Sequence, residues 1–246
     1  MSIFRSMTFY ILVVALSFAS YSIASAQVDF TSDEAAFIAA NPLLELQTFN
    51  AANVPPGGTI NCGIFVDENT NNACFTPGDI LPNLGIGNSG DNALIASGAN
   101  VFTNNNPANV LVTNIATDSF EILLGGAANR VGITIGCLAG QVSVAPGCDD
   151  TIDVTVFGTT GPIGSTTVSV DDEVDTFVGI TADGVITQVN VGPTNVTANT
   201  FPALLNIRFG SDPRNVPSLS EWGLIAMAGV LGLAGFIVVR RRQLAV

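Results

Sequence analysis

The 246-residue chain contains no histidine and no lysine, and these two absences narrow the chemistry that is open to it. Without histidine, Ser-His and Cys-His nucleophile pairs are excluded, and without lysine Schiff-base and Ser-Lys schemes are excluded too. Two carboxylates could still serve a glycoside hydrolase. Because no motif singles out a pair among the acidic residues, the sequence predicts a protein that is not an enzyme.

Basic residues of any kind are scarce. Between residues 27 and 215, nineteen Asp and Glu residues stand against three arginines, which gives a formal charge of −16. A surface of this charge repels nucleic acid and anionic lipid, so a nucleic-acid partner is excluded. The same surface attracts divalent cations.

Large amphipathic aromatic residues are also missing from the central part of the chain. Tyr10, Tyr21 and Trp222 all lie outside residues 27–215, where the aromatic residues are phenylalanines. At strand positions we expect these phenylalanines to fill the core. A sugar-binding face built on Trp or Tyr is therefore disfavoured, whereas a binder built on polar loops and calcium stays open.

The N-terminal segment has the features of a secretory signal. Arg5 precedes an apolar stretch at residues 9–18, and Ala24-Ser25-Ala26 forms a small-residue cleavage site. The stretch is too short to be a second membrane anchor. We therefore predict a signal peptide at residues 1–26 and an exported domain that follows it.

A second apolar run lies close to the C-terminus. Residues 223–239 carry no charge, and a helix of that length spans roughly 25 Å. Trp222 and the stems of Arg240, Arg241 and Arg242 can cover the remaining thickness of a bilayer. We predict a single transmembrane helix with the arginines in the cytoplasm and the preceding domain outside. A buried core helix is the alternative, against which the arginine triplet argues.

The residues around this run form a recognisable signal. They read Val216-Pro217-Ser218-Leu219-Ser220-Glu221-Trp222-Gly223, followed by the apolar run and the basic stop. Residues 216–242 resemble the IPTL-CTERM sorting signal of Gram-negative bacterial surface proteins, a relative of PEP-CTERM. The usual opening is Ile-Pro-Thr-Leu-Ser-Glu-Trp, from which Val216 and Ser218 depart conservatively.

This resemblance implies a route for the protein. An exosortase-like enzyme in the membrane would recognise and cut near the motif, and the product would reach the cell surface or extracellular matrix. Exopolysaccharide of that matrix is a further candidate partner. Whether the tail is cleaved or kept as an anchor stays open.

Four cysteines lie in two close pairs. An even number in an exported chain predicts disulfides, and three connectivities are possible. We favour Cys62–Cys74 and Cys137–Cys148, because each pair brackets a turn-rich loop. A zinc site is disfavoured by the spacing and by the absence of histidine.

The hydrophobic pattern predicts an all-β domain at residues 27–210, a sandwich or jelly roll, with a short linker at 211–217. Thr31 and Glu34 form a capping-box pattern for one short helix that ends at Asn41-Pro42. Asp183-Gly184 predicts a hairpin between its flanking strands. Residues 50–108 read as long loops with short strands. The predicted strands are 43–49, 110–115, 120–124, 130–135, 151–157, 166–170, 175–181, 185–191 and 204–209.

Calcium is the best ligand hypothesis that the acidic residues support. Asp67, Asn69 and Asn71 present oxygens at alternate positions, as at the start of a calcium loop. That loop lacks a glycine at its sixth place. A second cluster contains Asp171, Asp172, Glu173 and Asp175, and a third contains Asp149, Asp150 and Asp153. The alternative, that these are solvated turn residues, stays open.

The sequence thus predicts a non-catalytic exported protein of the cell surface or extracellular matrix, acting in adhesion or matrix assembly. The alternative is a calcium-dependent carbohydrate-binding module of jelly-roll type.

Overall fold

The architecture was taken from a computed structural model of the 246-residue chain. It describes residues 27–90, 92–98, 109–115, 117–138, 150–170, 175–194 and 201–211. The predicted signal peptide, the linker beyond residue 211, the sorting motif and the apolar run lie outside this part of the chain. Among the described residues, no helix is long and apolar enough to cross a membrane.

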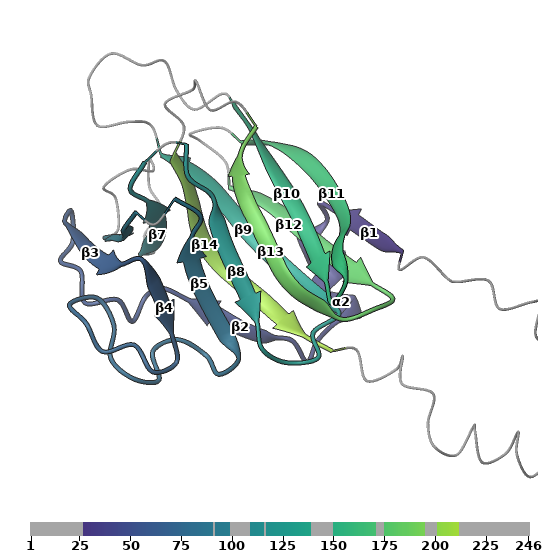
Figure 1. The fold of residues 1–246 in the computed structure, drawn as a ribbon, viewed down its shortest axis with the longest axis horizontal. Helices are drawn as coiled ribbons and strands as arrows, with labels where there is room; N and C mark the ends of the chain where they lie inside the picture. The colour runs from purple at the N-terminus through teal and green to yellow at the C-terminus, as the bar shows by residue number, and fades with distance from the viewer. Residues whose placement is uncertain are drawn as a thin grey trace, which may run out of the picture.

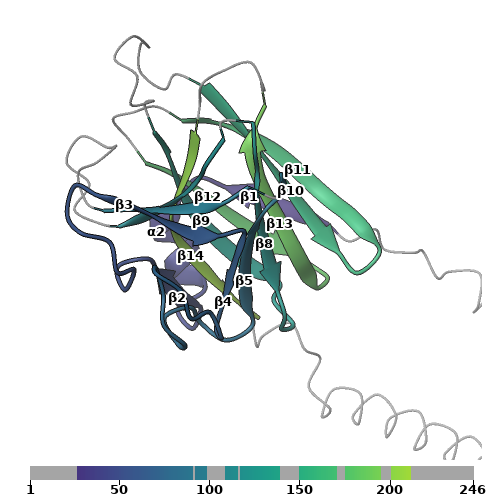
Figure 2. The same ribbon diagram turned by 60° about the vertical axis from the view of Figure 1, so that its left-hand side comes forward.

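Two antiparallel sheets stack face to face in a sandwich (Figure 1; Figure 2). Within the described residues one sheet has eight strands and the other has six. The eight-stranded sheet contains, in spatial order, β1 (Val28–Thr31), β12 (Thr176–Ala182), β9 (Arg130–Leu138), β14 (Phe201–Gly210), β7 (Val110–Thr113), β6 (Leu94–Ser97) and β3 (Thr59–Gly63), with β2 (Glu45–Thr48) also paired to β14. The six-stranded sheet contains, in spatial order, β11 (Gly161–Val170), β10 (Asp150–Gly158), β13 (Ile186–Pro193), β8 (Phe120–Leu124), β5 (Leu84–Asn88) and β4 (Phe65–Asp67).

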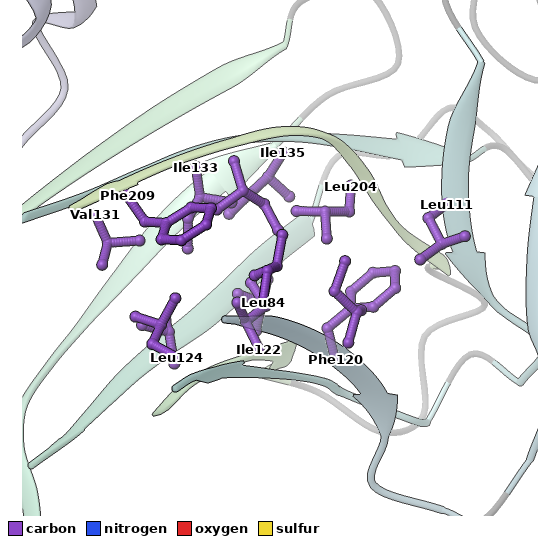
Figure 3. Packing of buried hydrophobic residues seen from close by; sticks show 14 of the residues in the cluster. Leu84, Leu111, Phe120, Ile122, Leu124, Val131, Ile133, Ile135, Leu204 and Phe209 are labelled. Atoms are coloured by element: carbon purple, nitrogen blue, oxygen red, sulfur yellow. The ribbon is translucent and has the colours of Figure 1, made fainter. Parts of the chain in front are cut away.

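The core fills the space between the two sheets. Figure 3 shows the side chains of β9, β14 and β7 pointing toward those of β5 and β8. Strand β10 shows why these residues form strands, because Ile152, Val154 and Val156 are fully buried while Asp153 and Thr155 alternate with them on the outer face. Each such aliphatic side chain contributes roughly 1.5–3 kcal/mol by leaving water. The all-β sandwich prediction is therefore confirmed.

One helix, α2 (Glu34–Ala40), covers part of the outer face of the eight-stranded sheet. Its N-cap is Asp33, whose carboxylate accepts the Ala36 N–H at 2.9 Å. The capping-box prediction with Thr31 as the cap was wrong, because Thr31 is the last residue of β1. Asn41 ends the helix, as predicted.

The predicted hairpin at Asp183-Gly184 was also wrong. Strand β12 pairs with β1 and β9, whereas β13 pairs with β10 and β8 in the opposite sheet. The connection crosses between the sheets, and its backbone bonds go elsewhere: the Ala182 N–H donates to the Asn129 carbonyl at 3.0 Å and the Ile186 N–H to the Ala128 carbonyl at 2.7 Å. The Asp183-Gly184 pair thus predicts a turn in the chain, but it does not predict which strands pair on either side of the turn.

The phenylalanines do not all fill the core. Phe65 on β4 is 41% exposed, although Phe75 and Phe120 are buried as expected. Where the structure describes residues 50–108, that is at 50–90 and 92–98, it has four short strands, β3 to β6, which agrees with the predicted loops with short strands. The predicted strand at 43–49 is shorter in the structure, since β2 spans Glu45–Thr48.

Candidate functional site

A depression of about 340 Å³ opens on the outer face of the eight-stranded sheet, beside α2. Its wall combines hydroxyl, amide and carboxylate groups with two apolar side chains. The lining residues are Glu34, Thr48, Asn50, Thr134, Asp175, Phe177, Leu205 and Asn206. We refer to this set as the depression.

The floor of the depression is one row of residues that crosses four strands. The strand register places Thr48 opposite Asn206, Asn206 opposite Thr134, and Thr134 opposite Phe177. The Thr134 hydroxyl donates to Asn206 Oδ1 at 3.0 Å. Since Oδ1 is engaged in this way, the amide of Asn206 is held in a fixed orientation with its Nδ2 donors on the other side.

A β-bulge in β14 shapes one wall. The register against β9 shifts between Leu204 and Asn206, so that Leu205 is the additional residue. Leu204 and Ile207 belong to the core between the sheets, whereas Leu205 packs in a separate small cluster and lines the depression next to Asn206. Bulges commonly redirect side chains beside functional sites, and here one places two consecutive side chains on the same face.

Asp175 lies just before β12 and reaches over β9. A Cβ built on Gly136 would lie 3.1 Å from Asp175 Oδ1 and 3.0 Å from Leu205 Cδ1, so the glycine leaves room for both side chains. The residue as a whole is exposed, but its carboxyl is partly desolvated by this contact. Burial therefore raises the pKa of Asp175 above its ordinary value of 3.8.

Two elements complete the rim. Glu34 is the first residue of α2, and Asn50 follows β2. Asn50 Oδ1 accepts the Asn109 N–H at 3.2 Å, which joins this rim to the start of β7. The depression is thus assembled from α2, β2, β9, β12 and β14, which are far apart in the sequence.

The chemistry of the depression follows from its groups. It offers hydroxyl and amide donors, carboxylate acceptors and a small apolar wall, and none of the described residues in its lining is basic. Such a set suits an uncharged ligand that is rich in hydroxyl groups, because each polar group can then find a hydrogen-bond partner. An anionic ligand would face Glu34 and Asp175.

Among these residues, the sequence predicted a ligand-binding role only for Asp175. A signal for Thr134 was present, because the alternation of Val131, Ile133 and Ile135 assigns Thr134 to the other face of its strand. For Asn206 no such signal existed, since the bulge at Leu205 breaks the alternation. Glu34 and Asn50 reach the lining of the depression only through the tertiary fold, so no local pattern could have identified them.

The first predicted calcium cluster lies in the loop that follows β4. Asp67 Oδ1 accepts the Asn69 N–H at 2.9 Å and the Thr70 hydroxyl at 3.2 Å, so the carboxylate closes its own turn. Asn69 and Asn71 are exposed. Calcium binding by Asp67, Asn69 and Asn71 stays a prediction.

The second predicted cluster is only partly described. Asp171 and Asp172 lie outside the described residues, and Asp175 lines the depression. Among the residues that the structure does describe, no three Asp, Glu, Cys or His side chains gather closely enough to hold a metal ion.

One of the two predicted disulfides is confirmed. Cys62 and Cys74 are bonded, with a Cα–Cα distance of 5.3 Å, and both are buried at the end of the sandwich core. The bond closes the loop that carries β4 and the Asp67 turn. The predicted Cys137–Cys148 pair lies outside the described residues, because Cys148 is among those not described.

The solved structures that align with this chain have low sequence identity to it and low TM-scores. A family 29 carbohydrate-binding module, CBM29-2, aligns over 69% of this chain and 98% of its own with 10% identity and a TM-score of 0.31. The same module in complex with mannohexaose aligns over 74% of this chain and 92% of its own with 9% identity and a TM-score of 0.30. A family two carbohydrate esterase from Cellvibrio japonicus aligns over 53% of this chain and 36% of its own with 13% identity and a TM-score of 0.22. Because these TM-scores are low, neither the fold nor the ligand of these proteins can be inferred for this chain.

Comparison of the sequence alone was more informative. No curated protein sequence matches the chain. The family model described as the IPTL-CTERM motif matches residues 216–243, which confirms the resemblance seen in the sequence. The chain therefore carries an IPTL-CTERM motif at residues 216–243, a C-terminal sorting signal for membrane processing.

Proposed function

We propose that the chain is an exported, non-catalytic protein of the cell surface or extracellular matrix whose β-sandwich binds an uncharged carbohydrate in the depression. The sorting signal at residues 216–243 supports the destination. The row Thr48, Asn206, Thr134 and Phe177 carries the binding proposal, because it presents fixed polar groups on a rigid sheet rather than on loops.

The nature of the ligand follows from the lining groups and from the charge. Hydroxyl, amide and carboxylate groups at close spacing match the alternating donors and acceptors of sugar hydroxyls. A domain with a formal charge of −16 disfavours uronic-acid polymers and nucleic acid. Neutral exopolysaccharide of the matrix is the partner that fits both conditions.

The absence of catalysis is part of the proposal. The chain has no histidine or lysine, so only its carboxylates could act as acid and base. Glu34 and Asp175 both line the depression, and a glycoside hydrolase needs such a pair. In a binder these carboxylates accept hydrogen bonds from sugar hydroxyls, and the sugar leaves unchanged.

Processing by an exosortase-like enzyme is the proposed route to the surface. After cleavage near Trp222, the sandwich would be released from the apolar run at 223–239. Mass spectrometry of the surface form tests this step. Peptides that end before the run support cleavage, whereas peptides that continue through it would show a retained single-pass anchor.

The binding proposal is tested on a glycan array with the full-length protein, in calcium and in EDTA. Saturable binding of neutral oligosaccharides, with no release of new reducing ends, supports it. Binding confined to anionic glycans, or hydrolysis of the bound sugar, contradicts it. A deletion strain with normal biofilm cohesion and normal cell aggregation would contradict the role in matrix assembly.

A further inference from the structure

The outer face of the six-stranded sheet carries an aligned set of side chains that the depression does not use. The register across the sheet places Phe65, Gly87, Glu121, Asn190, Thr155 and Ser165 opposite one another in turn. We call this set the outer row. In Figure 1 the six-stranded sheet faces the viewer, and α2 lies on the far side of the sandwich.

Phe65 at one end of the outer row lies flat on the neighbouring strand. A Cβ built on Gly85 would lie 2.6 Å from Phe65 Cζ, and one built on Gly87 would lie 3.3 Å from Phe65 Cδ2. The ring therefore occupies the space that two side chains would otherwise fill. Because Phe65 is 41% exposed, part of the ring is accessible to solvent.

The outer row becomes polar beyond Phe65. Glu121, Asn190 and Thr155 are half-buried, and Ser165 on the edge strand β11 is exposed. Gln188 Nε2 donates to Asn190 Oδ1 at 2.6 Å, which holds the Asn190 amide beside the row. Along the outer row, the aromatic ring of Phe65 is thus followed by one carboxylate, one amide and two hydroxyl groups. These polar groups lie on adjacent strands.

We propose that the outer row is a second carbohydrate-binding surface, on which one extended, uncharged polysaccharide chain lies across the strands. This inference rests on the proposed function and deepens it. Six strands at about 4.8 Å spacing make the row about 24 Å long, which suits a polymer rather than a single sugar. An exposed aromatic ring can stack on the apolar face of a pyranose, and the polar groups can bind its hydroxyls.

Charge selects this occupant over a second copy of the chain. Glu121 lies in the row and Asp153 lies beside it on β10, and no basic residue occurs on the strands of this sheet. Two copies that met here would place these carboxylates together, with formal charges of −16 on each domain. Phe65 and Leu123 are the large exposed apolar side chains that the described strands place on this face, so a second copy would bury little apolar surface here.

A surface on each outer face has a consequence for assembly. The depression lies on the eight-stranded sheet and the outer row on the six-stranded sheet, so the two open in opposite directions. One molecule could then hold two polysaccharide chains at once. Such bivalent binding strengthens attachment to a polymer network without any new contact.

Affinity electrophoresis of the full-length protein tests the outer row. The probes are hydroxyethyl cellulose and galactomannan, with polygalacturonate as the anionic control. Phe65→Ala is expected to weaken retardation by a neutral polymer about tenfold, or roughly 1.4 kcal/mol. Phe65→Leu, which keeps an apolar side chain but removes the ring, is expected to show most of this loss. Leu43→Ala, which removes a side chain that is 76% exposed outside both surfaces, is expected to behave as wild type.

The outcomes separate this inference from the proposed function. Retardation that is lost in Asn206→Ala but unchanged in Phe65→Ala would overturn the outer row and leave the depression intact. An unretarded wild-type protein would overturn both. A dimer in sedimentation velocity that disappears in Phe65→Ala would assign this face to self-association and overturn the polysaccharide. If Phe65→Leu were retarded by the neutral polymer as strongly as wild type, this would contradict the proposed stacking of the Phe65 ring on a sugar.

Discussion

The rings of Phe37 and Phe177 lie 5.5 Å apart between centroids, with their planes inclined at 57°. Phe37 comes from α2 and Phe177 from β12, and both are buried. Beneath them Gly132 and Gly179 lie opposite each other on β9 and β12. A Cβ on Gly179 would lie 2.6 Å from Phe37 Cδ2, so this glycine pair leaves the space that the ring of Phe37 occupies. The contact fixes α2 on the sheet and brings Glu34 to the depression.

Replacing Phe37 by alanine is expected to lower the free energy of unfolding by about 3 kcal/mol, because the variant loses a buried ring and leaves a cavity. Urea denaturation followed by circular dichroism measures the change. Leu43→Ala is the control, since its side chain is exposed and should stay within about 0.5 kcal/mol of wild type. Equal destabilisation of both variants would contradict this role of Phe37.

A Cβ at position 179 should act on the same contact from the other side. Gly179→Ala is expected to destabilise the protein by roughly 1–3 kcal/mol, because the methyl group would meet the Phe37 ring and Thr31 Cγ2. In the double variant with Phe37→Ala this cost should shrink, which a double-mutant cycle detects as coupling. Additive effects would mean that the strain at position 179 arises elsewhere.

The fold class and most of the later strands could be predicted from sequence. Residues 151–157 alternate cleanly, and β10 extends over Asp150–Gly158 with the predicted faces. Local alternation suffices in such a strand because one face is buried and the other is solvated. Residues 50–108 gave no such pattern, since β5 is buried along its length and β4 has three residues.

The candidate site could not be predicted, because it depends on pairing between distant strands. The turn at Asp183-Gly184 joins two different sheets, and the bulge at Leu205 shifts Asn206 onto the face of Thr134. Neither event has a local signal in the sequence. The sequence did identify Asp175 as a candidate ligand-binding residue. It did not identify the other side chains that line the depression with it.

The Cys62–Cys74 disulfide should be a major source of stability for the loop that carries β4. Replacing both cysteines with alanine is expected to cost about 3 kcal/mol, since the bond closes a loop of 12 residues. Scanning calorimetry measures the loss. Peptide mapping without reduction should recover the Cys62–Cys74 link, and a Cys62–Cys137 link would contradict the structure.

Asp175→Asn tests the raised pKa of this carboxyl. Because burial disfavours the charged form in the folded state, ionisation of Asp175 costs stability as the pH rises above its ordinary pKa of 3.8. In EDTA, the asparagine variant is expected to melt higher than wild type at pH 7. The difference should shrink as the pH falls and vanish below about 3.8.

The control for this comparison is Asp29→Asn, which removes the same charge from an exposed position on β1. It separates the local effect at the depression from the general relief of negative charge. If both variants raise the melting temperature equally at pH 7, local desolvation of Asp175 is not the cause.

Calcium is expected to raise the melting temperature of the acidic domain. The physical reason is the relief of repulsion among its carboxylates. Differential scanning fluorimetry in millimolar calcium and in EDTA measures the shift. Asp171→Asn with Asp172→Asn should reduce it more than Asp67→Asn, because the Asp67 carboxylate is engaged in its own turn. Identical melting curves in both buffers would contradict calcium binding.

The most direct test of carbohydrate binding in the depression is calorimetric titration with the neutral oligosaccharide that binds best on the array. Thr134→Val removes the hydroxyl that holds Asn206 and is expected to weaken binding about tenfold. Thr187→Val is the matched control, because it removes a similarly bonded hydroxyl from the other sheet, one that donates to the Phe157 and Gly158 carbonyls at 3.3 and 3.2 Å. Binding that is about tenfold weaker in Thr134→Val and unchanged in Thr187→Val is the predicted result. Equal affinity in wild type and Thr134→Val would contradict the account.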